Sequence, residues 1–142
     1  MTPPNMTAAH LVFHGSVVLL ASLLFGAPYA RAIKRQADAQ VVNSWRVAHQ
    51  SLAIGALLLL VLAAIQPLLQ APAWALGAMN LLMVVSAYAF TVATPLAAIT
   101  RDRGLQSGSV GLARWVYLGN MLGAVSSLLS AALLLILAVR AL

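Results

Sequence analysis

The chain has 142 residues, of which 63% are hydrophobic and 7% charged, and its mean hydropathy is +0.97. These values exclude a water-soluble domain and indicate an integral membrane protein. A formal charge of +6 would point to nucleic-acid binding in a soluble chain, but here the cations lie between apolar runs. That pattern reports membrane topology, so no nucleic-acid partner is expected. The absence of cysteine excludes disulfides, iron–sulfur clusters and thiolate ligands.

Four apolar runs predict an all-α fold, a single four-helix transmembrane bundle over residues 1–142 surrounded by membrane lipid. The first helix is expected at about 8–30, with Thr7 as its N-cap. Its opening residues lack the positive n-region of a signal peptide, so it is interpreted as a retained span. His10 and His14 share one face at a spacing that suits a metal, but no acidic residue or cysteine nearby completes a site, and a solvated His10 is the simpler interpretation.

The other three helices are expected at about 44–66, 74–100 and 110–139. The second has Asn43 or Ser44 as its cap and stops at Pro67, whereas Pro95 lies near the end of the third. The cationic connections 31–40 and 101–108 both belong in the cytoplasm by the positive-inside rule, although Arg140 argues weakly against this. The uncharged connection 66–73 and both termini are then expected on the opposite, periplasmic side.

The fourth helix carries small residues four positions apart, at Gly119, Gly123 and Ser127. This spacing lets two membrane helices approach closely. The pattern leaves two interpretations open, a contact inside the chain and an oligomer seam.

The second helix opens with polar, aromatic and cationic residues that lead to His49, one to two turns below the cytoplasmic interface. A neutral imidazole in an apolar bundle can be an axial ligand of haem iron. Arg46 and Arg114 are expected at the same level, where guanidinium groups can pair with propionates. Trp45 either flanks the macrocycle or anchors the helix at the interface. His49 can equally be a structural or proton-relay residue.

His14 is expected roughly 15 to 20 Å from His49 along the membrane normal, too far for both to ligate one haem. The remaining common membrane chemistries find little support. The two carboxylates, Asp38 and Asp102, both lie in expected loops, which excludes paired-carboxylate catalysis. The chain also has no phosphate-binding loop of the GxxxxGKS type.

Three segments together resemble the styrene oxide isomerase family, small bacterial membrane enzymes with four transmembrane helices. His14-Gly15 followed by Leu23-Leu24-Phe25-Gly26 is similar to the family pattern HG…LLFG, and Trp45 to His49 is similar to WxxAH, whose histidine binds haem b. Arg103-Gly104-Leu105 with Gly108 is similar to RGLxxG and follows His49 at the family distance. These segments cover most of the chain.

The resemblance implies a homotrimer in the bacterial inner membrane, with ferric haem b between neighbouring protomers and His49 as the iron ligand. It implies a small apolar substrate, an aryl epoxide that is isomerised to an aldehyde without net redox change. Two positions depart from the family. Its active-site asparagine corresponds to Gly55 and its active-site tyrosine to Thr94. Tyr88, almost two turns before Thr94, either supplies a hydroxyl to this pocket or is a packing residue.

Three hypotheses therefore stand after the sequence alone. The first is an epoxide isomerase that uses ferric haem as a Lewis acid. The second keeps the haem without turnover, as a sensor, carrier or electron-transfer subunit. The third is a transporter or structural four-helix protein without a cofactor, in which His49 is merely packed.

Overall fold

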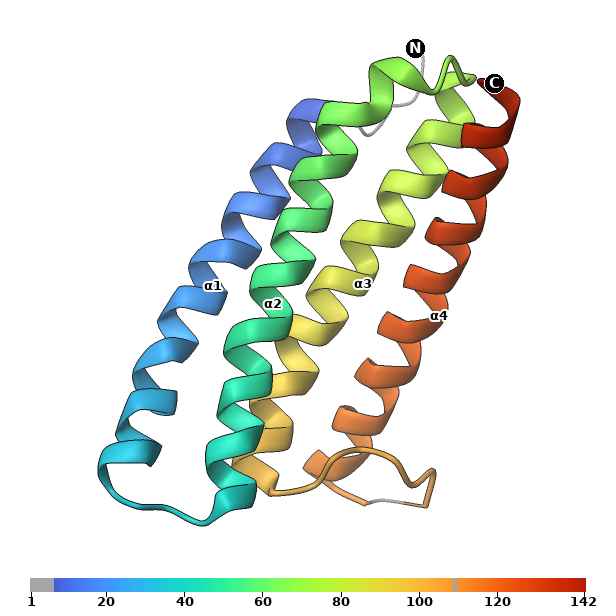
Figure 1. Cartoon of the computed structure of the whole chain (residues 1–142). Helices are drawn as coiled ribbons and strands as arrows, with labels where there is room; N and C mark the ends of the chain where they lie inside the picture. Colours follow the sequence, from blue (N-terminus) through green and yellow to red (C-terminus); the bar gives the residue numbers. More distant parts are fainter. Residues whose placement is uncertain (1–6, 109) are drawn as a thin grey trace.

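The computed structural model describes residues 7–108 and 110–142, and four long helices make up most of this part of the chain (Figure 1). A single turn of 3-10 helix, Gln66–Leu68, follows the second helix. All four helices are long and apolar enough to cross a membrane, and the described residues include no strand. The predicted four-helix transmembrane fold is confirmed. The helices are α1 (Ala8–Lys34), α2 (Ala39–Ile65), α3 (Ala73–Thr100) and α4 (Leu112–Arg140).

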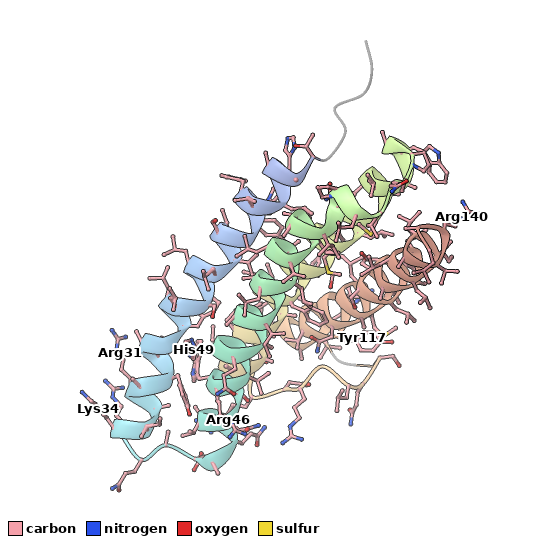
Figure 2. The ribbon with its side chains drawn as sticks, turned by 45° about the horizontal axis from the view of Figure 1, so that its top comes forward. Arg31, Lys34, Arg46, His49, Tyr117 and Arg140 are labelled. Atoms are coloured by element: carbon pink, nitrogen blue, oxygen red, sulfur yellow. The ribbon has the colours of Figure 1, made fainter. Side chains whose placement is uncertain are left out.

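The helices form two hairpins, α1 with α2 and α3 with α4, which meet mainly where α2 packs on α3. α4 makes its main contacts with α3 alone, so one side of α2 and α3 is left uncovered. The described ends of the chain lie at one end of the bundle, and the connecting residues 35–38, 101–108 and 110–111 lie at the other (Figure 1). Arg31, Lys34 and Arg46 occupy the second end, whereas Arg140 lies at the first (Figure 2).

Helix bounds differ from expectation at the first connection. α1 runs on to Lys34, and α2 begins at Ala39 with Asp38 as its N-cap, so the expectation of a cap at Asn43 or Ser44 is wrong. These polar turns stay helical because they project beyond the apolar layer, where water solvates the side chains. A cation in the last turn of α1 and Asp38 at the start of α2 also complement the helix dipoles.

The start of α1 follows the prediction, because Thr7 is its N-cap. The backbone N–H of Thr7 donates to Nδ1 of His10 at 3.2 Å. His10 is exposed, and its ring accepts this bond from the N-cap residue, so it helps to cap the start of α1.

The small residues of α4 make a contact inside the chain. A Cβ built on Gly119 would lie 2.9 Å from the Cβ of Ala93, and one on Gly123 would lie 2.8 Å from the ring of Phe90. The Ser86 hydroxyl donates to the Gly123 carbonyl at 2.8 Å, which joins α3 to α4 at the same place. Of the two interpretations left open for this spacing, Gly119 and Gly123 therefore serve the contact between α3 and α4.

We expect Gly119→Val to destabilise the protein, because the new side chain overlaps Ala93 where two helices already touch. The expected loss of unfolding free energy is about 1–3 kcal/mol. Thermal unfolding in detergent measures the effect. Gly77→Val is the matched control, since a Cβ at Gly77 in α3 has no atom within 4 Å. Equal melting temperatures for the two variants would contradict the assigned contact.

The connection between α3 and α4 is held against α4 by its own backbone. Gly104 has a φ of +62°, and a Cβ there would lie 2.8 Å from the Tyr117 nitrogen, so glycine is required for both conformation and space. The Gly104 N–H donates to the Asp102 carboxylate at 2.7 Å, and the Asn120 side chain donates to the Arg103 carbonyl at 3.0 Å. The family-like RGL segment is thus a fixed loop at the cationic end of α4.

Candidate functional site

His49 lies half-buried between α1 and α2, in the half of the bundle that carries the cationic connections (Figure 2). Its Nδ1 is 2.8 Å from the backbone oxygen of Ser22. In the reverse direction the Ser22 hydroxyl donates to the backbone oxygen of His49 at 2.6 Å. This reciprocal pair ties the two helices together and fixes the direction of the imidazole ring.

The contact with Ser22 also decides which ring nitrogen carries the proton. A carbonyl oxygen only accepts hydrogen bonds, so Nδ1 of His49 must be the N–H donor. Nε2 of the neutral ring then keeps its lone pair. Among the described residues Nε2 has no hydrogen-bond partner. Every buried side-chain nitrogen or oxygen of these residues has a partner, so Nε2 is not buried and is accessible. An imidazole oriented by a backbone carbonyl, with its other nitrogen open, is the usual arrangement of a metal-ligating histidine.

The α1 side of this site is a stripe of residues one helical turn apart. Gly26 faces the imidazole, because a Cβ built on it would lie 3.5 Å from Cε1 and Nδ1 of His49. The Tyr29 ring stacks on the imidazole, with centroids 6.2 Å apart and 28° between the planes. Phe25 and Trp45 form a second ring pair, with centroids 6.1 Å apart. The LLFG-like and WxxAH-like segments therefore meet across the α1–α2 seam.

The two arginines expected near His49 are placed differently. Arg46 lies one turn before His49 on α2, is exposed, and donates to the Asn43 side-chain oxygen at 2.5 Å. Arg114 is exposed in the first turn of α4, the helix that packs on α3. The structure thus brings Arg46 to the level of His49 in the same chain. Arg114 lies at the same cationic end of the bundle, but on α4, whose main contacts are with α3 rather than with α2.

An apolar groove of about 730 Å³ fills the open side between α2, α3 and α4. Gly55 and Thr94, the two positions expected to differ from the family, both line it and so face one space. A smaller polar hollow of about 290 Å³ adjoins its cationic end and shares Val47, Thr94 and Asn120 with it. The groove is walled mainly by aliphatic side chains: Val18, Val47, Leu52, Ile54, Leu58, Val61, Leu62, Ile65, Met83, Leu128 and Leu134.

His49 and Tyr88 do not line this groove. Gly55 follows His49 by six residues and is turned about 120° away around the α2 axis. The Tyr88 hydroxyl instead lies 2.9 Å from Nδ1 of His14, between α3 and α1. His14 precedes Ser22 by eight residues, about 12 Å along α1, which again keeps the two histidines from sharing one haem. The expected pocket residues therefore fall into three places: the His49 seam, the groove and the His14–Tyr88 pair.

Sequence reasoning missed four residues that the structure places at these sites. Gly26 and Tyr29 have a signal in the sequence, since both follow Ser22 at helical spacing and Gly26 belongs to the LLFG-like segment. Ser22 contributes its carbonyl, which every residue has, so nothing in the sequence marks it. Asn120 lies in the groove beside Thr94, and its one signal was an amide side chain in an apolar helix.

The fold and these sites define a four-helix integral membrane protein with an oriented, accessible histidine in one helix seam and an apolar groove on another side. The family model described as Styrene oxide isomerase matches residues 7–139. The chain therefore belongs to the styrene oxide isomerase family. Comparison with curated proteins found no match, and comparison with solved structures found none.

Proposed function

We propose that this protein binds haem b through His49 and isomerises aryl epoxides to aldehydes. The observation that carries the proposal is the accessible Nε2 of His49, held by the bond from Nδ1 to the Ser22 carbonyl. Membership of the styrene oxide isomerase family supports the reaction class.

The residues around His49 suit a flat, hydrophobic macrocycle with two acidic groups. Gly26 leaves the ring uncrowded, and Phe25, Tyr29 and Trp45 supply aromatic surface. Arg31 and Arg46 lie at the same end of the bundle (Figure 2), where guanidinium groups can pair with propionates. Ferric haem, when bound, supplies a Lewis acid for the epoxide oxygen.

The groove supplies the second requirement of the reaction, which is the exclusion of water. Isomerisation passes through a benzylic carbocation that water would trap as a diol. The aliphatic walls of the groove give such a cation no nucleophile. The hydroxyl proton of Thr94 is already donated to the Phe90 carbonyl at 2.8 Å, which holds its oxygen close to the helix.

The His49 seam and the groove lie on different faces of α2, so one chain does not bring them together. We therefore place the reaction between two copies in a homotrimer, as the family resemblance implies. One copy holds the haem at its α1–α2 seam and the next offers its groove. The charge pattern supports insertion in a bacterial inner membrane, with the cationic connections in the cytoplasm and both termini in the periplasm.

The direct test is the visible spectrum and the product of the purified protein with phenyl oxirane. We expect a Soret band and formation of phenylacetaldehyde, with no diol, and we expect both to depend on added hemin in haem-depleted protein. A colourless protein that ignores hemin would refute the cofactor.

A haem protein without turnover is the second candidate, because Gly55 and Thr94 stand where the family has asparagine and tyrosine. The same preparation distinguishes it. Easy reduction with tight carbon monoxide binding, and no aldehyde from any aryl epoxide, would favour a sensor, carrier or electron-transfer role. Ferric iron that binds epoxide analogues would favour the isomerase.

A further inference from the structure

We infer that Asn120 is the residue that binds and orients the substrate oxygen in the groove. Asn120 of α4 lines this space together with Gly55 of α2 and Thr94 of α3. The inference deepens the proposed isomerase function and rests on it for the reaction. The binding contact itself involves only the groove and needs no cofactor.

The other polar side chains of the groove have no proton to offer a ligand. Five of the described residues that line it are polar, and four of these are hydroxyl residues whose single proton is donated to a backbone carbonyl. These bonds are Ser51 to Val47, Ser86 to Gly123, Thr94 to Phe90 and Ser127 to Ala124, with donor–acceptor distances between 2.5 and 3.0 Å. The fifth polar residue is Asn120.

The Asn120 side chain is oriented by the loop that precedes α4. Its Nδ2 is 3.0 Å from the Arg103 carbonyl, and because a carbonyl only accepts, this end of the amide must be the nitrogen. An amide nitrogen carries two N–H groups, and this bond uses one. Asn120 therefore keeps one N–H, the only side-chain donor left to a ligand among the described residues that line the groove.

This arrangement selects a ligand class. The aliphatic walls accommodate an apolar body, and the single free N–H matches an oxygen that accepts a hydrogen bond without donating one. A cyclic ether or a carbonyl attached to an aryl group has both features, and a hydrocarbon has only the first. The described residues that line the groove itself include no charged side chain, and Arg103 lines only the adjoining hollow. An ionised ligand in the groove would therefore lose its hydration without a counter-charge beside it.

Gly55 leaves room for a test of this role from the opposite wall. A Cβ built on Gly55 has no atom within 4 Å. The Cβ of an asparagine placed there therefore meets no neighbour, and Gly55 lines the same groove as Asn120. If the groove needs one amide donor, α2 can supply it in place of α4.

The experiment measures binding of 3-phenyloxetane, a cyclic ether that does not isomerise, and of isopropylbenzene, a hydrocarbon of similar size. The full-length protein in lipid nanodiscs is used with and without hemin. We expect Asn120→Leu to weaken phenyloxetane binding about fivefold to tenfold, the value of one hydrogen bond, and to leave isopropylbenzene binding unchanged. The double variant Gly55→Asn/Asn120→Leu should recover most of the ratio between the two affinities.

Asn120→Leu also removes the hydrogen bond to the Arg103 carbonyl, so weaker binding could come from a missing donor or from a loosened loop. The double variant distinguishes these two causes. Recovery of the ratio at an unchanged melting temperature supports the binding role. An unchanged ratio in Asn120→Leu, or a fall in the ratio that Gly55→Asn does not repair, would overturn it. A failure of the haem proposal is seen separately, as a missing Soret band, and leaves these affinities as they are.

Discussion

Replacing His49 with alanine is expected to remove the Soret band and abolish isomerisation. The variant loses the one nitrogen that the Ser22 carbonyl leaves with an accessible lone pair. Loss of an oriented ligand should lower hemin affinity by more than about 100-fold, because changes to supporting partners alone already cost 10–100-fold at metal sites. Titration of the haem-depleted protein with hemin, followed at the Soret band, measures this.

His14→Ala is the matched control for the His49 variant. Both histidines are half-buried on transmembrane helices and use Nδ1 in a hydrogen bond, His49 with Ser22 and His14 with Tyr88. The His14 variant should keep the Soret band, since its ring lies about 12 Å farther along α1 from the Ser22 level. Retention of the band in His49→Ala, or its loss in His14→Ala, would show that His49 is not the haem ligand.

The fold was predictable because span length and loop charge are properties of short sequence windows. Pro67 and the uncharged turn marked one connection, and Thr7 marked the start of α1. The start of α2 was not predictable, because Asn43 and Ser44 are good caps in isolation. Asp38 competes with them five to six residues earlier, where the helix can continue into water.

The site divides in the same way. His49 stood out because an imidazole in an apolar run needs a partner, and the sequence could not show that this partner is a backbone carbonyl. Gly55 and Thr94 were expected in one pocket and do line one groove. Tyr88 was weighed as a substitute hydroxyl, but the rotation of α3 turns it toward His14. The rotation of a helix about its axis depends on its packing against other helices. No short pattern in a single sequence encodes that packing.

The separation of His49 from the groove leads to a second large expected effect, which concerns mixed assemblies of the proposed homotrimer. We expect His49→Ala and Gly55→Trp to be inactive alone, the first without an iron ligand and the second with a filled groove. Co-expressed in equal amounts, they should regain about one quarter of the wild-type activity per trimer. In a head-to-tail ring each site combines His49 of one copy with the groove of the next, and about one contact in four joins two intact halves.

A second mixture, at the same equal expression, distinguishes a shared site from a complete site in each chain. Wild-type chains co-expressed with the double variant His49→Ala/Gly55→Trp should retain about one quarter of the activity if two copies share each site, and about one half if each chain holds a complete site. Differently tagged chains allow the ratio of the two variants in the total trimer population to be measured before assay with phenyl oxirane. Recovered activity in the first mixture, together with one quarter of the wild-type activity in the second, requires a site shared by two copies. Each copy then presents His49 to one neighbour and its groove to the other. No recovery in the first with one half in the second would return the whole reaction to a single chain.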